Sequence, residues 1–187
     1  MDQFYRALEL TAKSRIERDS TFDRFAARVL LDCVSREVLG QESTLQQRAT
    51  DYNQQFANYI KIGIEYERLD PRLAEFDLQR LTKAIVPARD MLFDYLGIGT
   101  IYDRYLLQVN KRRIEMPQWL FMRVAMGLAL NETDREARVI EFYNTLSSFD
   151  FMSSTPTLFN AGTQRPQLSS CYLTTIADDL GDIYMGI

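Results

Sequence analysis

The spacing of apolar residues constrains the fold of this chain most, because over much of residues 20–149 they recur every three or four positions. This period places them on one face of an α-helix. The clearest case runs from Ser20 to Gly40, with inward positions at Phe22, Phe25, Val29, Leu30, Cys33, Val34 and Val38. Ser20 or Thr21 is expected to cap this helix and Gly40 to end it. Because Cys33 lies on the apolar face, we interpret it as an inert core thiol.

Similar periodicity predicts helices in the next part of the chain. One is expected through Tyr52 to about Leu69. The pair Asp70-Pro71 should stop it, because the residue before a proline disfavours the helical region. Shorter helices are expected at about residues 77–85 and 88–95.

Two more helices are predicted before residue 150. The first starts at Pro117, which suits the first turn of a helix, and its inward residues are Phe121, Val124, Ala125 and Leu128. Asn131 or Thr133 should cap the second, whose apolar stripe is Ala137, Ile140, Tyr143 and Leu146.

A polar stretch between two apolar runs predicts a small β-hairpin. Residues 105–107 and 113–115 flank the polar segment 108–112. The basic run Lys111-Arg112-Arg113 at this turn is typical of a solvated loop. Upstream, Gly97-Ile98-Gly99 lacks a third glycine and a preceding strand, so we do not expect a dinucleotide fingerprint there.

Composition excludes several kinds of site. The chain has no histidine, which removes histidine-based catalytic groups and His-ligated zinc, haem or di-iron sites. Its two cysteines, Cys33 and Cys171, are too few for a four-thiolate metal site or a secreted disulfide scaffold. We therefore expect no bound metal and a reducing, cytoplasmic location. A net charge of −4 without a long basic run argues against nucleic acid as a partner. No apolar stretch approaches the roughly 20 residues that span a membrane, so no membrane association is expected.

The composition changes at about residue 150, which suggests a helical domain at 1–149 and a second region at 150–187. The second region is rich in Ser, Thr, Gly and Pro. It also contains two short apolar runs, 157–159 and 170–173, that we expect to be buried strands. Loop chemistry beside buried strands is where binding sites are often built.

Two features of this second region suit ligand binding. Cys171 has nucleophilic and redox potential, although a lone cysteine in a strand is more often structural. Backbone amides in the turn at residues 160–162 could cradle an anion. Hydroxyl donors near these features are Thr155, Thr157, Ser169 and Ser170.

Several long runs of residues closely resemble the large, catalytic subunit of ribonucleotide reductase. They are STPTLFNAGT at 154–163, RPQLSSCYL at 165–173, YDRYLL at 102–107, RIEMPQ at 113–118 and FMRVAMGL at 121–128. The resemblance extends over about residues 15–187. It implies a mainly helical N-terminal domain followed by the first strands of a ten-stranded α/β barrel, with the nucleotide site inside that barrel. The activity it implies is the reduction of ribonucleotides, as diphosphates, by radical chemistry that supplies deoxyribonucleotides for DNA replication.

The resemblance also implies roles for particular residues. Cys171 matches the cysteine that pairs with a second, distant cysteine, and the two thiols become a disulfide as they reduce the substrate. Thr155 and Ser170 match positions that contact the substrate at its phosphates and ribose. Asp178, Asp179 and Leu180 match the start of the specificity site, where a deoxynucleoside triphosphate or ATP effector binds at a homodimer interface. An alternative is that Asp178 or Asp179 only caps a helix that begins near Leu180.

The resemblance implies partners, because the second reducing cysteine and the radical cysteine of the family have no counterparts here. We expect the remaining C-terminal part of the α subunit, a second α subunit, and a small metal-containing β subunit that supplies the radical. Adenosylcobalamin is the alternative radical source. A thioredoxin or glutaredoxin type protein should re-reduce the disulfide. No counterpart of the family's N-terminal activity module is expected.

The chain is therefore expected to be inactive alone, as part of a split or truncated subunit. Residues 150–187 expressed without the rest of the barrel are expected to be poorly soluble, because their apolar strands would be unpaired edges. The alternative from a different functional class is a non-catalytic helical interaction module derived from the same fold.

Overall fold

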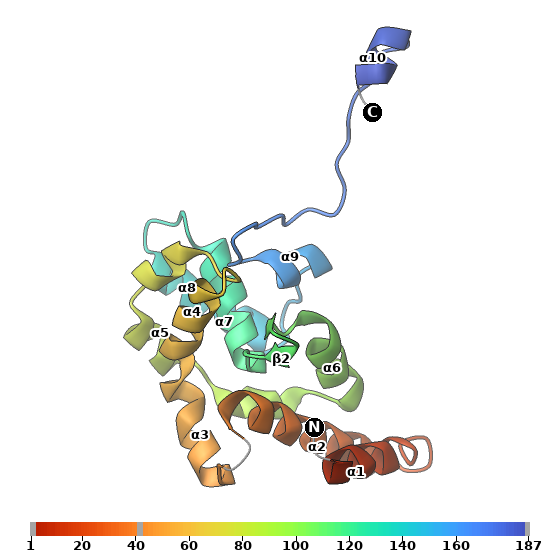
Figure 1. Ribbon diagram of the computed structural model, residues 1–187, viewed down its shortest axis with the longest axis vertical. Helices are drawn as coiled ribbons and strands as arrows, with labels where there is room; N and C mark the ends of the chain where they lie inside the picture. The colour runs from red at the N-terminus through yellow and green to blue at the C-terminus, as the bar shows by residue number, and fades with distance from the viewer. Residues whose placement is uncertain (1–2, 41–42, 186–187) are drawn as a thin grey trace.

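The computed structural model describes residues 3–40 and 43–185 and is mainly helical (Figure 1). The helices are α1 (Gln3–Lys13), α2 (Thr21–Leu39), α3 (Leu45–Gln54), α4 (Phe56–Glu65), α5 (Leu78–Ala84), α6 (Tyr95–Thr100), α7 (Pro117–Leu128), α8 (Arg135–Ser147), α9 (Thr155–Asn160) and α10 (Leu180–Met185). Short 3-10 helices lie at Pro71–Glu75 and Pro87–Leu92, and a π-helical turn lies at Ile101–Tyr105. Within the described ranges, no helix is both long and apolar enough to cross a bilayer.

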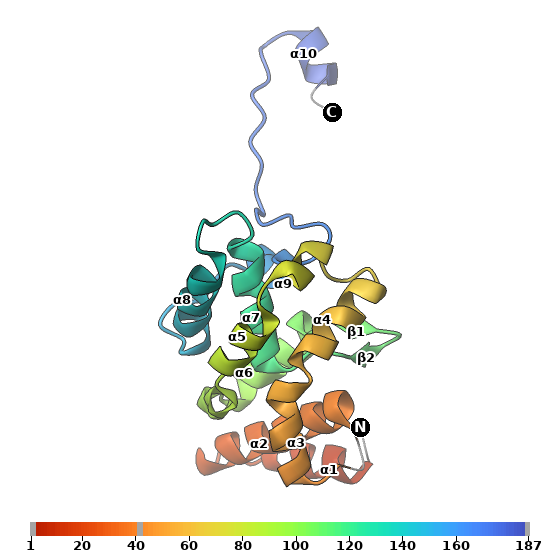
Figure 2. The ribbon, with the colours of Figure 1, turned by 90° about the vertical axis from the view of Figure 1, so that its left-hand side faces the viewer.

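Helix α7 is the centre of the core, and Figure 2 shows it between its neighbours. Its first ten residues, Pro117 to Met126, are all buried, as expected for a helix that other elements surround on every side. Trp119 packs edge-on against Tyr52 and stacks on Tyr59, with ring centroids 5.9 and 5.2 Å apart. The predicted helix from Pro117 is confirmed, although Leu128 at its end is 38% exposed and does not point inward.

A buried polar network ties the core helices together. Tyr52 Oη donates to Asp90 Oδ2 at 2.7 Å, and Gln118 Nε2 donates to Asp90 Oδ1 at 2.8 Å. Tyr143 Oη donates in turn to Gln118 Oε1 at 2.8 Å. Burial raises the pKa of Asp90 to about 6, although these two hydrogen bonds oppose the shift.

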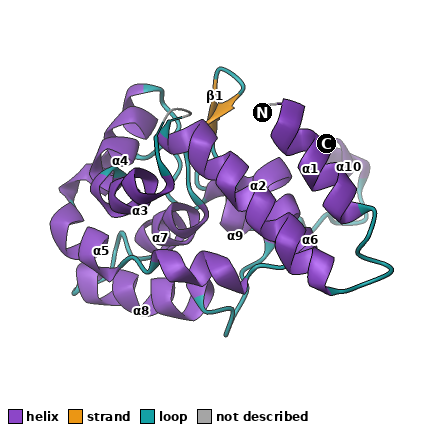
Figure 3. Cartoon of the chain, turned by 90° about the horizontal axis from the view of Figure 1, so that it is seen from below, coloured by secondary structure: helices purple, strands orange, loops and turns teal. Residues whose placement is uncertain are grey.

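Helix α2 confirms the predicted helix at 20–40, with corrections at its start. Ser20 makes no side-chain capping bond, and Asp19 Oδ1 instead accepts from the Thr21 amide at 2.9 Å. Gly40 ends the helix with φ of 124°, a value that favours glycine. Phe25 is 46% exposed, so it was wrongly placed on the inward face. Helix α1, which no prediction included, packs along α2 (Figure 3).

The predicted helix from Tyr52 to Leu69 is two helices. Helix α3 ends at Gln54 and α4 begins at Phe56. The Tyr52 carbonyl accepts a hydrogen bond from Trp119 Nε1 at 3.0 Å, so it serves the core rather than a continuous helix. Beyond α4, Leu69 is buried and pairs as an isolated β-bridge with Thr163.

Helix α5 confirms the prediction at 77–85, but the one at 88–95 was wrong. Residues 87–92 form a 3-10 helix, and the α-helix starts only at Tyr95. Asp94 causes this start, because its Oδ1 accepts from the Gly97 amide at 2.6 Å. Gly97 and Gly99 therefore lie inside α6 rather than in a phosphate-binding loop.

A hairpin is present, but its strands are displaced from the expected ones. β1 (Gln108–Val109) pairs antiparallel with β2 (Arg112–Arg113), so most of the paired residues lie in the segment 108–112 that was expected to be the turn. The turn residues Asn110 and Lys111 have φ of 51° and 65°, the left-handed values that two-residue hairpin turns require. The basic run is only partly solvated. Both Arg112 and Arg113 bond to Glu37 of α2, and the Arg113 guanidinium lies 3.5 Å from the centroid of the Tyr102 ring.

Helix α8 confirms the last predicted helix, but its cap is Asp134 rather than Asn131 or Thr133. Asp134 Oδ1 accepts from the Ala137 amide at 3.4 Å. Tyr143 and Leu146 are buried as expected.

The chain after α8 differs most from expectation. Residues 157–159 lie in helix α9 rather than in a strand, because Pro156 suits the first turn of a helix and Leu158 packs inward. Residues 170–173 form no β-pairing within the described ranges. A mainly helical fold with a small two-stranded sheet is thus confirmed, whereas the barrel that should follow stays a prediction.

Candidate functional site

Helix α9, which carries Thr155, is held against α7 by a close backbone approach. A Cβ atom added at Gly127 would lie 2.1 Å from the Gly162 backbone nitrogen. Gly162 itself has φ of 76°. Only glycine at position 127 leaves room for the chain to turn back over α7 directly after α9.

A buried ion pair fixes the end of α9. Arg123 Nε donates to Glu115 Oε1 at 2.7 Å, and both side chains are fully buried. The same guanidinium donates to the carbonyl oxygens of Ala161 at 2.7 Å and Leu158 at 3.2 Å. These are carbonyls at the C-terminal end of α9, so Arg123 caps the helix through tertiary contact.

Glu115 is the hub of this network. Its carboxylate also accepts from the hydroxyl of Tyr59 and, at 3.0 Å, from the Leu107 amide next to the hairpin. Burial, followed by the negative charge of Glu115, raises the pKa of Tyr59 well above that of an ordinary tyrosine. The phenol therefore stays protonated and remains a donor.

Thr155 lies on the exposed first turn of α9, beside a groove of about 550 Å³. Its Oγ1 lies 3.1 Å from the hydroxyl of Tyr105. The groove is mostly apolar, and its walls include Phe93, Leu96, Ile101, Tyr105, Phe149, Met152 and Leu158. The hydroxyl residues Thr100, Tyr105, Ser153 and Thr155 and the carboxylate residue Asp94 border this mostly apolar hollow. Such a geometry suits a ligand or chain segment with a polar atom at one end.

The other predicted site residues lie on a tail that runs away from the helical body (Figures 1 and 2). Ser170 and Cys171 are exposed, and Ser170 Oγ lies 4.0 Å from Cys171 Sγ. The neighbouring Leu173 is fully exposed. The structure therefore does not bring Thr155 together with Cys171, and the roles predicted for these residues stay predictions.

The three residues predicted for effector binding lie at the far end of this tail. Asp178 and Asp179 precede α10 and Leu180 is its first residue. Asp179 Oδ1 accepts from the Gly181 amide at 2.9 Å, as a residue at a helix start does. This supports the capping interpretation for Asp179 without testing an effector role. Residues 186–187, which end the predicted specificity-site segment, lie outside the described residues.

The anion cradle predicted at residues 160–162 is not formed. The Ala161 amide donates to the Thr157 carbonyl at 3.0 Å, and the Thr163 amide donates to the Asn160 carbonyl at 3.0 Å. Gly162 is pressed against α7. The Ala161 and Thr163 amides donate to backbone carbonyls and so stabilise the local fold. A glycine-containing turn alone was therefore a poor predictor of anion binding.

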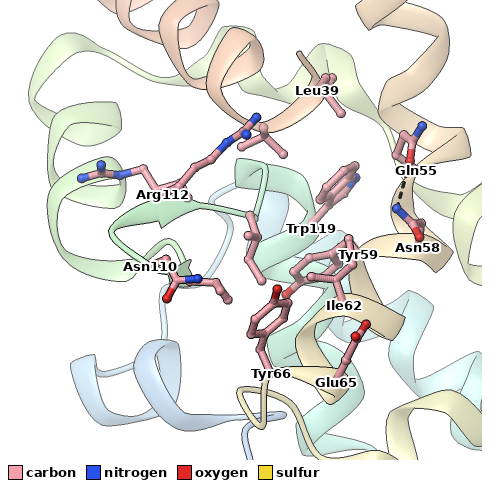
Figure 4. Close-up of a pocket in the computed structure, with 14 residues that line it drawn as sticks. Leu39, Gln55, Asn58, Tyr59, Ile62, Glu65, Tyr66, Asn110, Arg112 and Trp119 are labelled. Atoms are coloured by element: carbon pink, nitrogen blue, oxygen red, sulfur yellow. Dashed lines mark hydrogen bonds between the residues drawn. The ribbon is translucent and has the colours of Figure 1, made fainter. Parts of the chain in front are cut away.

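A second groove, of about 660 Å³, lies between α4, the hairpin and α7 (Figure 4). Tyr59, Ile62 and Tyr66 of α4 line it, together with Asn110 and Arg112 of the hairpin. Among the described residues that line it, none is a residue that the sequence predicted for catalysis, substrate or effector.

Sequence reasoning missed the residues that hold α9: Tyr105, Glu115 and Arg123. A signal was present for one of them. Arg123 interrupts the apolar run from Trp119 to Met126, and a charge at a core position requires a buried partner. The sequence does not show that this partner is Glu115.

Comparisons with known proteins match one family, over part of the chain or nearly all of it. Residues 91–166 match the family described as "Ribonucleotide reductase, all-alpha domain". The ribonucleoside-diphosphate reductase subunit alpha of Chlamydia muridarum is 45% identical over 176 residues, which cover 94% of this chain and 17% of that protein. The ribonucleoside-diphosphate reductase large subunit of Danio rerio is 36% identical over 169 residues, which cover 90% of this chain and 21% of that protein.

Another relative matches a shorter part of the chain at higher identity. The Helicobacter pylori subunit alpha is 50% identical over 111 residues, or 59% of this chain and 14% of that protein. The chain thus spans about a fifth or less of the length of these relatives. The matched residues 91–166 include α7, α9 and both members of the Glu115–Arg123 pair. The resemblance seen in the sequence is confirmed, and the chain belongs to the ribonucleotide reductase large-subunit family, as an N-terminal part of that subunit.

Proposed function

We propose that this chain is the N-terminal portion of a catalytic subunit that reduces ribonucleoside diphosphates to deoxyribonucleoside diphosphates by radical chemistry. The observation that carries the proposal is the 45% identity over 94% of the chain to a protein named ribonucleoside-diphosphate reductase subunit alpha. A match of 176 of the 187 residues extends beyond the helical body into the tail that carries Cys171.

Cys171 is proposed as one of the two reducing thiols. Replacing the 2′-hydroxyl of a ribonucleotide by hydrogen takes two electrons and two protons and releases water. Two thiols supply both and become one disulfide. The second thiol must come from outside this chain, because Cys33 is buried within α2 and burial raises its pKa to about 11. The exposed position of Cys171 supports this role.

The hydroxyl residues are proposed to bind substrate. Thr155 is exposed beside the groove, and Ser170 adjoins Cys171, so both hydroxyls are available to a ligand. Asp178, Asp179 and Leu180 are proposed to start the effector site for a deoxynucleoside triphosphate or ATP. The support for that site is the resemblance of the sequence, together with the exposure of this segment.

Completion of the active site is proposed to need other chains or segments. The tail exposes large apolar side chains at Tyr172, Leu173 and Leu180, which favours burial against the rest of the α subunit. A second α subunit, a small metal-containing β subunit and a thioredoxin or glutaredoxin type reductant complete the proposed cytoplasmic system. Adenosylcobalamin is the alternative source of the radical. The chain alone is proposed to be inactive.

The test is Cys171→Ser in the complete subunit that contains this chain, assayed with its radical source and a dithiol reductant. We expect deoxyribonucleotide formation under multiple turnover to fall by at least a hundredfold. The matched control is Cys33→Ala, which removes the other cysteine of the chain and should leave the rate within about twofold. Unchanged turnover in Cys171→Ser would refute the proposal and favour a non-catalytic interaction module.

A further inference from the structure

The hydroxyl of Tyr105 is the hydrogen-bond partner of Thr155, and this contact joins two elements that lie 50 residues apart in the chain. We propose that Tyr105 is a positioning residue: it donates its proton to Thr155 Oγ1 and so directs the Thr155 proton toward the groove, where it meets a substrate oxygen. The inference rests on the proposed function, because it assumes that Thr155 contacts substrate.

The direction of this hydrogen bond follows from the chemistry of the two groups. A threonine hydroxyl has one proton to donate and two lone pairs that accept. A phenol is more acidic than an aliphatic hydroxyl, so it is the stronger donor of the two. With Tyr105 donating, Thr155 accepts through one lone pair and keeps its own proton for a ligand. With the bond reversed, Thr155 would have no proton left to offer.

Tyr105 is rigidly placed for this role. It ends the π-helical turn that follows α6 and is 8% exposed, whereas Thr155 is exposed. The Tyr105 ring packs on that of Phe159, with centroids 4.7 Å apart. Phe159 lies on α9 itself, so the ring of Tyr105 contacts the same helix that its hydroxyl orients.

The opposite end of α9 is also fixed. Arg123 donates to the Leu158 and Ala161 carbonyls at that end, while Tyr105 bonds to the first residue of the helix. A six-residue helix is too short to be stable by itself. Contacts at both ends therefore set where Thr155 lies and how its hydroxyl points.

The Thr155 hydroxyl borders the groove of about 550 Å³, so a ligand in that groove could accept its proton. Tyr105, Thr155 and Leu158 all line it, and most of its other walls are apolar. A hydroxyl proton in apolar surroundings has few alternative acceptors, so its hydrogen bond to an anionic or polar substrate oxygen is strengthened. Loss of the Tyr105 hydroxyl leaves Thr155 free to rotate, and binding must then order it. We expect this to raise KM for the diphosphate substrate about five- to tenfold.

The experiment compares Tyr105→Phe, Thr155→Val and the double variant in the complete subunit, with KM and kcat measured for a ribonucleoside diphosphate. Tyr105→Phe keeps the ring on Phe159 and removes only the hydroxyl. The matched control is Tyr102→Phe, which removes a hydroxyl from the same π-helical turn that donates to Glu37 of α2, at 3.1 Å, rather than to Thr155 of α9. Thermal unfolding of each variant reports any general loss of structure.

The expected result is a higher KM in Tyr105→Phe with kcat within about twofold and unfolding similar to that of the Tyr102→Phe control. In the Thr155→Val background, the same change should have no further effect on KM, because its target is gone. If Thr155→Val raises KM while Tyr105→Phe does not, or if the two effects multiply, the positioning role is overturned. If Thr155→Val leaves KM unchanged, the substrate contact proposed for Thr155 fails, and the inference with it.

Discussion

Replacing Arg123 by methionine should be among the most damaging single changes in the helical body. The substitution keeps a side chain of comparable length but removes the guanidinium. Glu115 would then be a buried carboxylate without its counter-charge, because both residues have no exposed surface. The Leu158 and Ala161 carbonyls at the end of α9 would lose their donor as well.

The expected cost is about 3–5 kcal/mol, the usual range for breaking a buried ion pair by removing one partner. For a chain of this size, that lowers the unfolding midpoint by about 10 °C. Urea unfolding of the chain, followed by circular dichroism, measures the free energy. Arg138→Met is the matched control, because the Arg138–Glu141 pair is solvent-exposed on α8 and should be worth less than about 1 kcal/mol.

A second substitution separates buried charge from lost packing. In the Arg123→Met background, Glu115→Gln removes the uncompensated charge and keeps an oxygen that can accept from Tyr59. The double variant should therefore be more stable than Arg123→Met alone. Equal costs for Arg123→Met and Arg138→Met, or a double variant that is less stable than Arg123→Met, would refute this account of the network.

Three further predictions concern pH, thiol reactivity and backbone packing. Burial raises the pKa of Asp90 to about 6 from 3.8, so its contribution to stability is full below pH 4 and is lost as the pH rises through 6. The stability of the wild type relative to Asp90→Asn should fall by up to about 3 kcal/mol between pH 4 and pH 7 in urea unfolding, and a constant difference would contradict this. At pH 8 a thiol reagent should label Cys171 rapidly and Cys33 only on unfolding, because Cys171 is exposed and Cys33 is buried; two fast thiols would contradict the structure. Gly127→Ala should destabilise the chain by about 1–3 kcal/mol, because its Cβ would meet backbone, whereas the control Gly99→Ala has open space and should be neutral or stabilising; equal effects would argue against the close approach.

The periodicity of apolar residues predicted a helix correctly where that helix buries one defined face. It located α2, α7 and α8 and identified Cys33 as a core thiol. It failed where tertiary contacts decide the local structure. Near the break between α3 and α4, the Tyr52 carbonyl accepts from Trp119 Nε1, and Trp119 lies more than sixty residues further along the chain.

The expected strands at 157–159 and 170–173 show a second limit. A β-strand forms only when a neighbouring strand is present to hydrogen-bond with it. A short apolar run in the sequence does not show whether such a neighbour exists. Pro156 and the inward position of Leu158 favour a helix once α7 is available to pack against.

The candidate site was only partly predictable. The resemblance pointed to Thr155, Ser170, Cys171 and the run 178–180, and these roles stay predictions. The residues that hold α9 in place escaped notice because their partners are set by the fold. Tyr105 and Arg123 acquire their significance only when α9 is seen packed between them.

In the proposed reaction, Cys171 delivers reducing equivalents to a nucleotide. The most direct test is a single-turnover reaction of the complete subunit with its radical source and a ribonucleoside diphosphate, without external reductant. Alkylation and peptide mass spectrometry then identify the oxidised cysteines. We expect Cys171 to be recovered in a disulfide with a cysteine outside this chain, in proportion to the deoxyribonucleotide formed. Product formation with Cys171 still a free thiol would contradict it.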